Sequence, residues 1–294
     1  MKIAIFGQYY QNDTRPIIRD IFVFFNANAV ELVIEKNFLE ILYQEEIVKK
    51  PYKTFSNSSD LDATFDTLIS IGGDGTILRA ATFVRNSGIP ILGINAGRLG
   101  FLAKVQKEDI ESFLQIVIEK KYTLSHRSLL SLHTDQAIDG FSDINFAMNE
   151  ITVSRKDTTS MITIETYLNG EYLNSYWADG LIISTPTGST GYSLSCGGPI
   201  LTPEVAALVI TPIAPHNLNA RPLVIPDNTE IELRVSGRET NYLVSLDSRI
   251  ASVSNNAILK IKKTPFKINM IEIPAETFFK TLRNKLLWGE DKRN

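Results

Sequence analysis

The pattern of apolar residues changes near residue 127, and this change limits the fold more than any other feature of the sequence. Before it, short apolar runs alternate with segments of helical periodicity, such as residues 16–26. Alternating strands and helices predict an open, mostly parallel sheet with helices on both faces. The strands expected in this part are residues 3–6, 29–34, 68–71 and 89–94.

From residue 127 onward, strand patterns follow one another with few helical segments between them. Asn169-Gly170 separates two alternating runs and predicts a type I′ hairpin. We therefore predict an α/β domain over residues 1–125, a C-terminal helix over 275–290 that packs back on it, and a β-rich, sandwich-like domain over 126–274. The strands expected in the second domain are 129–133, 149–154, 162–168, 181–184, 230–235, 242–246 and 257–262.

Composition narrows the class of protein. A chain of 294 residues with 44% hydrophobic and 21% charged residues is long enough for two globular domains. A net charge of -3 argues against a general binder of nucleic acid or membrane surfaces, and no apolar run approaches the length of a membrane span. Polar residues interrupt the N-terminal apolar run too soon for a signal peptide. We expect a cytoplasmic protein with no nucleic-acid or membrane partner.

The single cysteine, Cys196, excludes an intrachain disulfide. Three histidines at scattered positions offer no structural zinc site, so any bound metal is expected to have oxygen ligands. Cys196 is interpreted as a small buried residue, because the sequence shows no base beside it.

The segment GGDGT at 72–76 follows an apolar run and precedes a helical pattern. Glycines let a ligand approach the main chain, so successive N–H groups can surround a phosphate, and a helix expected to start at Thr76 or Ile77 would add its partial positive charge. Asp74 would repel a phosphate unless it binds a metal, accepts a hydroxyl proton or hydrogen-bonds a sugar. An ordinary turn is the alternative, since the same residues are common in turns and N-caps.

A second glycine-containing turn, residues 95–101, follows the next expected strand. The two turns could line one crevice, with Arg98 as a direct phosphate contact, although a plain strand-to-helix connection is equally compatible. Residues 179–193 carry the other signal, a strand that ends in a loop dense with hydroxyls and glycines. Such a loop can hydrogen-bond a nucleotide while Tyr192 offers a ring for stacking, or it can be a polar surface loop.

These motifs, taken with Asn149-Glu150 and in this order, resemble the NAD kinases. The TPTGSTGY segment at 185–192 makes the resemblance specific, because GGDGT alone also occurs in lipid kinases and, loosely, in phosphofructokinases. The resemblance covers the chain from about Ile3 to the C-terminal helix. It implies ATP-dependent phosphorylation of the 2′-hydroxyl on the adenosine ribose of NAD, with Mg²⁺ accompanying ATP, in a homodimer or homotetramer.

The resemblance also implies roles for individual residues. Asp74 would accept the proton of the 2′-hydroxyl, and Arg79 is a weaker candidate for a phosphate contact. Metal ligands are not identified. The residues implied in NAD binding are Asp74, Gly75, Asn149, Glu150, Asp179, Thr187, Thr190, Gly191, Tyr192, Ser193, Leu194, Ser195 and Ala214.

Several positions depart from the family pattern: Arg98, Gly191, Trp177-Ala178 and Asp247-Ser248. Gly191 and Trp177 bear on pocket shape, so the preference between NAD and NADH and the phosphoryl donor stay open. Asp247 is either a second carboxylate near the site or a hairpin residue. Two other functions are carried alongside, another GGDGT-type kinase acting on a lipid or sugar and a non-catalytic NAD-sensing protein.

Overall fold

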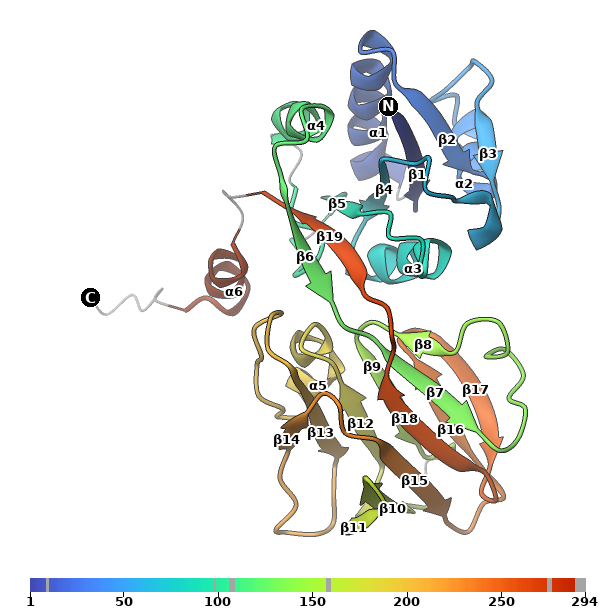
Figure 1. Ribbon diagram of the computed structural model, residues 1–294, viewed down its shortest axis with the longest axis vertical. Coiled ribbons are helices and arrows are strands. Elements are labelled where there is room, and N and C mark those ends of the chain that lie inside the picture. The colour runs from blue at the N-terminus through green and yellow to red at the C-terminus, as the bar shows by residue number, and fades with distance from the viewer. Residues whose placement is uncertain (9–10, 98, 106–108, 157–159, 274–276, 289–294) are drawn as a thin grey trace. The chain divides into compact units, whose positions relative to one another are not determined.

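The computed structural model describes residues 1–8, 11–97, 99–105, 109–156, 160–273 and 277–288 (Figure 1). The chain divides into two compact units. The first consists of Met1–His126 and Ile268–Asn294, and the second of Arg127–Lys267. The chain returns to the first unit at Ile268, earlier than residue 275, because the strand β19 (Ile268–Glu272) adds to the sheet of that unit.

The first unit contains a seven-stranded sheet in the order β3-β2-β1-β4-β5-β19-β6. The pairings of β2 with β3, of β1 with β2 and β4, and of β5 with β4 and β19 are parallel. This confirms the mostly parallel sheet expected from the alternating pattern. Besides β19, its strands are β1 (Lys2–Gly7), β2 (Glu31–Glu35), β3 (Lys53–Phe55), β4 (Thr67–Gly72), β5 (Ile91–Asn95) and β6 (Thr123–Arg127).

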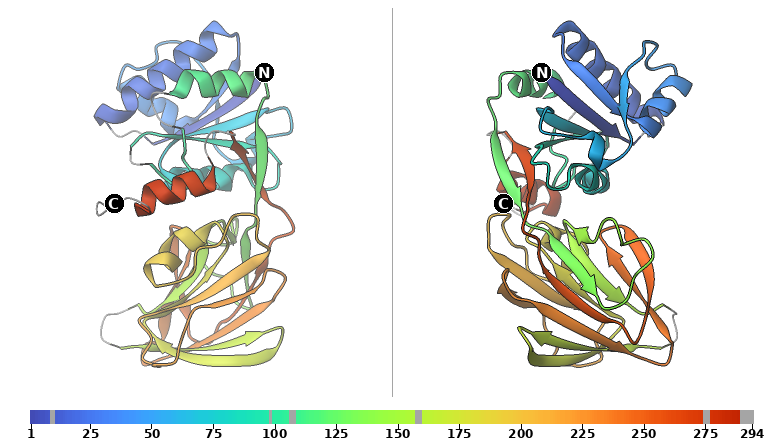
Figure 2. Two further views of the ribbon diagram at one scale, coloured as in Figure 1. Left: turned by 90° about the vertical axis from the view of Figure 1, so that its left-hand side faces the viewer. Right: turned by 45° about the vertical axis from the view of Figure 1, so that its right-hand side comes forward.

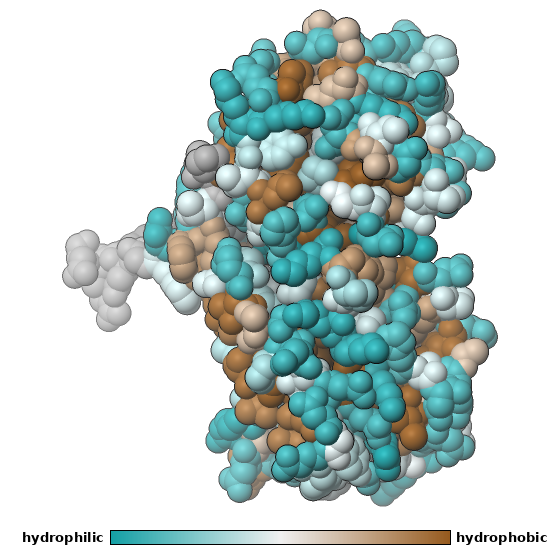
Figure 3. Space-filling view, viewed as in Figure 1, coloured by the Kyte–Doolittle hydropathy of each residue, from teal (hydrophilic) through white to brown (hydrophobic). Residues whose placement is uncertain are grey.

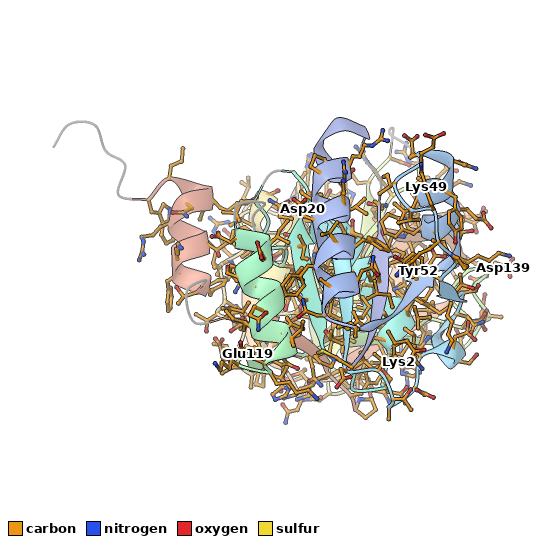
Figure 4. The ribbon with its side chains drawn as sticks, turned by 90° about the horizontal axis from the view of Figure 1, so that it is seen from above. Lys2, Asp20, Lys49, Tyr52, Glu119 and Asp139 are labelled. Atoms are coloured by element: carbon orange, nitrogen blue, oxygen red, sulfur yellow. The ribbon has the colours of Figure 1, made fainter. Side chains whose placement is uncertain are left out.

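Helices cover both faces of this sheet because its central strands β1, β4 and β5 have buried, mostly apolar residues on both sides. Ile3 and Ile5 join one core with residues of α1 (Gln11–Ala27), α2 (Lys36–Gln44) and α4 (Ile110–Ile118). Phe6 points to the other face and contacts Phe83 of α3 (Asp74–Val84). Figure 4 shows α1 and α4 side by side, and Tyr52, labelled there, packs on Phe22 of α1.

The second unit is a sandwich of two six-stranded sheets, in which neighbouring strands pair antiparallel among the described residues. The sheet orders are β11-β10-β15-β18-β7-β8 and β14-β13-β12-β9-β16-β17 (Figures 1 and 2). Its strands alternate buried and more exposed residues, as in β15, where Ile231, Leu233 and Val235 enter the core between the sheets. The β-rich second domain is thus confirmed.

The strands of the second unit have these bounds: β7 (Leu130–Thr134), β8 (Phe146–Ala147), β9 (Glu150–Ser154), β10 (Ile162–Leu168), β11 (Glu171–Ala178), β12 (Gly180–Ser184), β13 (Ala207–Ile213), β14 (Leu223–Pro226), β15 (Ile231–Ser236), β16 (Asn241–Leu246), β17 (Arg249–Ser254) and β18 (Ile258–Lys263). Asn169 and Gly170, between β10 and β11, both have positive φ, at 51° and 85°. The expected type I′ hairpin is therefore confirmed.

Two helices differ from the sequence expectation. The α1 helix begins at Gln11 and not at Pro16, so Pro16 lies inside it and removes one main-chain donor. Buried residues on the same helix, Ile17, Ile18 and Ile21, offset that loss by packing on the sheet.

The C-terminal helix α6 (Phe278–Leu286) belongs to the first unit, as expected, but not all of its apolar residues face inward. Leu282 is buried and Phe278 contacts Phe101, whereas Phe279 and Leu287 are exposed. Leu287 has a φ of 55° and ends the helix, which turns it off the apolar face. Residues 275, 276, 289 and 290 of the expected helix lie outside the described residues. No helix in the described ranges is long and apolar enough to cross a membrane.

Candidate functional site

In the first unit, the GGDGT turn forms the N-terminus of α3. The helix starts at Asp74, earlier than the expected Thr76 or Ile77, because the N–H groups of Thr76 and Ile77 already bond to the Gly73 carbonyl. Gly72 has a φ of 152°, and a Cβ there would lie 2.3 Å from the Thr76 hydroxyl oxygen. A Cβ on Gly73 or Gly75 would meet nothing within 4 Å. The main chain at this helix N-terminus is thus open to a ligand, as a phosphate cradle requires.

The Asp74 carboxylate is held where the second glycine-containing turn ends, by its last residue and the two that follow. Its oxygens accept hydrogen bonds from the N–H groups of Phe101 (2.8 Å), Leu102 (3.0 Å) and Ala103 (3.0 Å). Gly100 packs so closely that a Cβ on it would lie 1.9 Å from Asp74 Oδ1. Asp74 lies 27 to 29 positions before these donors in the sequence, so the two glycine-containing segments meet at its carboxylate. A carboxylate has about four lone-pair positions, so this arrangement orients Asp74 and leaves it capacity to accept a further proton donor.

The other candidates of the first unit are less well placed. The Arg79 guanidinium lies over the Phe6 ring, 5.5 Å from its centroid, and the side chain is exposed. Gly75 is exposed at the open end of the helix. Arg98 lies outside the described residues.

In the second unit, Met148, Asn149 and Glu150 form a corner at the start of β9, held from two sides. On one side the Asp247 carboxylate accepts hydrogen bonds from the N–H groups of Met148 (2.9 Å), Asn149 (2.8 Å) and Glu150 (3.2 Å). On the other side, the Thr185 hydroxyl donates to the Met148 carbonyl (2.6 Å) and its N–H donates to the Asn149 carbonyl (2.9 Å).

Two side chains of this corner carry polar atoms that lack a hydrogen-bond partner in the part of the chain that the structure describes. Asn149 Oδ1 and Glu150 Oε2 are buried and have no hydrogen-bond partner among the described residues. Gly191 lies directly beside them, since a Cβ on it would be 3.1 Å from Glu150 Oε2 and 3.5 Å from Asn149 Nδ2. A buried amide oxygen and a buried carboxyl oxygen without partners are expected where a ligand supplies them.

Burial and neighbouring charges shift the pKa values of the two carboxyl groups at this corner. Burial, and then the charge of Asp247, raise the pKa of Glu150 to about 8. Burial also raises the pKa of Asp247, against which the three N–H donors and the Arg249 guanidinium act. Asp247 has a φ of 52° and forms the turn between β16 and β17. It is thus both a hairpin residue and a second carboxylate.

Asp179 and Ala214 lie at the other end of β12 from the hydroxyl-rich loop. Six residue steps separate Asp179 from Thr185, about 20 Å in an extended strand. The Asp179 N–H bonds to the Ile213 carbonyl beside Ala214, and its carboxylate forms an ion pair with Arg155 (3.2 Å). The loop nevertheless brings Tyr192 within electrostatic range of Asp179, since burial, then Cys196 and the Asp179 carboxylate, raise the pKa of Tyr192.

The remaining loop residues split into two groups. Thr190 donates to the Thr187 carbonyl (3.1 Å), and Ser193 is buried against the Thr211 hydroxyl (2.8 Å), so these hydroxyls shape the loop. Tyr192 and Ser195 are exposed and Leu194 is half-buried, which leaves their surfaces accessible. Burial raises the pKa of the half-buried Cys196 thiol and disfavours its nucleophilic form.

Sequence reasoning missed three contributors. The main chain of residues 101–103 orients Asp74, the Thr185 hydroxyl holds the Met148 carbonyl, and Arg155 pairs with Asp179. Thr185 belongs to the hydroxyl-rich segment, so the sequence pattern could have identified it. The residues around Arg155 do not indicate that it pairs with Asp179. In the part of the chain that the structure describes, no group of three or more His, Cys, Asp or Glu side chains is placed to hold a metal ion.

Comparison with known proteins identifies the family. The ATP-NAD kinase N-terminal domain matches residues 4–122, and the ATP-NAD kinase C-terminal domain matches residues 148–273. The chain belongs to the NAD kinase family. NAD kinases of Flavobacterium johnsoniae and Flavobacterium psychrophilum are 75% and 76% identical to it over 294 residues, the whole of each chain. An NAD kinase of Bacteroides fragilis is 42% identical over 293 residues, again the whole of each chain.

Two solved structures have this fold. An NAD kinase from Archaeoglobus fulgidus in complex with ATP has a TM-score of 0.75 at 26% identity, over 98% of this chain and 99% of that one. Yeast NADH kinase complexed with NADH has a TM-score of 0.87 at 24% identity, over 100% of this chain and 89% of that one, a likeness of fold alone.

Proposed function

We propose that this chain is an NAD kinase, a phosphotransferase that uses ATP to phosphorylate the 2′-hydroxyl on the adenosine ribose of NAD and so supplies NADP. The observation that carries the proposal is the full-length match at 75% identity to a protein named NAD kinase. The open main chain at Gly73 and Gly75 and the unpartnered oxygens of Asn149 and Glu150 support it, because they suit a phosphate and a polar ligand.

In this reaction the ribose 2′-oxygen forms a bond to the γ-phosphorus of ATP. The bond between that phosphorus and the β–γ bridging oxygen breaks, ADP leaves, and Asp74 accepts the hydroxyl proton. Little charge builds on the nucleophile early in a loose transition state, so holding Asp74 in a fixed orientation contributes through positioning. The three N–H donors of residues 101–103 supply that orientation.

We assign NAD binding to the residues that the resemblance implies. Asn149 and Glu150 have buried atoms without partners, and Gly191 and Tyr192 lie next to them. Ser193 contributes through its main chain, since its hydroxyl is buried against Thr211. The other proposed NAD contacts are Asp74, Gly75, Asp179, Thr187, Thr190, Leu194, Ser195 and Ala214, with Arg79 as a phosphate contact.

A divalent cation, Mg²⁺, is proposed to bind with ATP and to neutralise phosphate charge. Phosphate oxygens and water would supply most of its ligands, as Mg²⁺ prefers.

A homodimer or homotetramer is also proposed. Trp177, Leu218 and Val224 of the second unit are exposed, and β11 and β14 are edge strands. Hydrophobic groups lie along the edge of this unit in Figure 3. Exposed apolar residues on sheet edges are typical of association surfaces. Light scattering would test the state by giving the mass in solution, and a cytoplasmic location stays a prediction that cell fractionation would test.

The deciding experiment incubates purified protein with ATP, Mg²⁺ and either NAD or NADH, and identifies products by chromatography and mass. NADP from NAD, accepted by an NADP-dependent dehydrogenase, would support the proposal and place the phosphate on the 2′-oxygen. Binding of NAD without product under any divalent ion would favour the NAD-sensing alternative. Phosphorylation of a lipid or sugar instead of NAD would favour the other GGDGT-type kinases.

A further inference from the structure

Three consecutive N–H groups converge on one carboxylate at the start of β9. Consecutive N–H groups of a regular strand point to opposite sides, so the N–H groups of Met148, Asn149 and Glu150 meet at Asp247 only because the chain bends there. The Asp247 N–H also donates to the Glu150 carbonyl (3.0 Å). The three hydrogen bonds to the Asp247 carboxylate join residues 97 to 99 positions apart and give the bend a fixed shape.

The carbonyl side of the same corner leaves it little room to move. Thr185 holds the carbonyls of Met148 and Asn149, and it accepts the Gly188 N–H (3.1 Å). Gly188 is so close that a Cβ on it would lie 2.2 Å from the Asn149 carbonyl oxygen. The bend is therefore held on both sides. The side chains of Asn149 and Glu150 project from it toward Gly191, and each has a buried oxygen without a partner among the described residues.

We propose that Asp247 is a positioning residue for dinucleotide recognition: its carboxylate holds the bend at Met148–Glu150 and thereby presents the Asn149 amide and the Glu150 carboxyl group to NAD. The proposal rests on the proposed role of Asn149 and Glu150 as NAD ligands. In this role Asp247 acts through the main chain, because both of its oxygens accept hydrogen bonds from main-chain N–H groups of the bend.

Electrostatics give Asp247 a second effect on the same ligand group. The groups that act on Glu150 are Asp247 and the Tyr192 N–H, and Arg249 acts on Asp247 in turn. Burial raises the pKa of Asp247, and its three N–H donors act in the opposite direction. When Asp247 is ionised, its charge adds to burial in raising the pKa of Glu150, so that Glu150 can keep a proton and donate a hydrogen bond to the ligand.

The test compares the full-length chain with Asp247→Asn and Asp247→Gly. Asn and Gly both tolerate the left-handed backbone at φ 52°, so the hairpin is kept while the carboxylate is removed. Asn has one acceptor oxygen and cannot satisfy three N–H groups, and Gly satisfies none. Leaving a buried donor unpaired costs enough free energy to raise the KM for NAD roughly tenfold. The KM for ATP should change less than about twofold.

The pH dependence separates positioning from a loss of general stability. In the parent protein, loss of the Glu150 proton should raise the KM for NAD above pH 8. Removing the charge of Asp247 should lower the pKa of Glu150, so this rise in KM should begin at a lower pH in both variants. Asp135→Asn is the matched control, because Asp135 also accepts a main-chain N–H, from Ile258 (3.0 Å), elsewhere in the second unit. It should leave both KM values and the pH profile unchanged.

Three results would overturn the proposal. They are an unchanged KM for NAD in folded Asp247→Asn and Asp247→Gly, equal increases in the KM for NAD and ATP, and loss of the folded state in both variants, which would make the carboxylate a requirement for folding alone. Glu150→Ala, which removes every hydrogen-bonding atom of this side chain, distinguishes the premise from the proposal. If it leaves the KM for NAD unchanged, the proposed NAD-binding role of the corner fails first.

Discussion

At the scale of single residues, Asp74 and Glu150 are two carboxyl groups prepared in different ways. Main-chain N–H groups of residues 101–103 bind the Asp74 carboxylate and fix its orientation. Glu150 is buried beside another acid, and its pKa is raised to about 8. Asp74 is therefore held in one orientation, and Glu150 is suited to retain a proton at neutral pH.

Asp74→Asn should lower kcat by roughly 10²-fold or more, because it removes the proton acceptor and leaves one oxygen for the three N–H groups of residues 101–103. The dissociation constant for NAD should change little. Steady-state kinetics and calorimetry would measure both quantities. Asp60→Asn is the control, since Asp60 also accepts main-chain N–H groups in the first unit, from Ser56 and Asn57. An unchanged kcat in Asp74→Asn would assign the proton to another group.

Glu150→Gln should stabilise the protein most at alkaline pH. The folded pKa of Glu150 lies above its ordinary value of 4.5, so the folded state holds a proton that the unfolded state releases between pH 4.5 and about 8. Stability from this group is therefore present below pH 4.5 and lost as the pH rises through 8. Gln has no such dependence. The difference in Tm between Glu150→Gln and the parent should grow from pH 5 to pH 9, and a constant difference would contradict the assignment.

At the scale of elements, the loop after β12 depends on two glycines that differ in what they touch. A Cβ at Gly188 would lie 2.2 Å from the Asn149 carbonyl oxygen, which is main chain and cannot turn away. A Cβ at Gly191 would lie 3.1 Å from Glu150 Oε2, the end of a side chain that can shift. Replacing glycine by alanine should therefore lower the free energy of unfolding more at Gly188 than at Gly191.

Gly188→Ala should displace the corner of β9 and lower the free energy of unfolding by about 1–3 kcal/mol, as overpacking does. Gly191→Ala should change stability by less than about 1 kcal/mol while altering the KM for NAD, because it narrows the space beside Glu150 and Asn149. Urea unfolding and steady-state kinetics would measure the two effects. Equal stability losses would show that the loop yields at both positions.

Local patterns predicted much of the secondary structure but not the contacts between distant segments. Apolar alternation located β10, and Asn169-Gly170 specified its turn, since both depend on neighbouring residues. Asp247 could be named only as a candidate, because its partners lie 97 to 99 positions away. Arg155 and the N–H groups of residues 101–103 were missed for the same reason, as nothing in their local sequence indicates a partner.

At the scale of the whole molecule, the second unit is one continuous segment with its own core. Residues 127–267 include both sheets of the sandwich and the apolar cluster between them. A fragment of these residues should fold alone and unfold in one cooperative transition, because a segment of this size can bury enough apolar surface. Circular dichroism and calorimetry of the fragment would test this, and a non-cooperative transition would contradict it.

The position of β19 has a consequence for synthesis of the chain. In the first sheet β19 lies between β5 and β6, yet the ribosome makes it only after the entire sandwich. Until β19 has been synthesised, β5 and β6 lack the strand that lies between them in the sheet, although all residues of the second unit have already been made. The N-terminal part of this protein is therefore begun first and completed last, which reverses the usual order in which domains mature during translation.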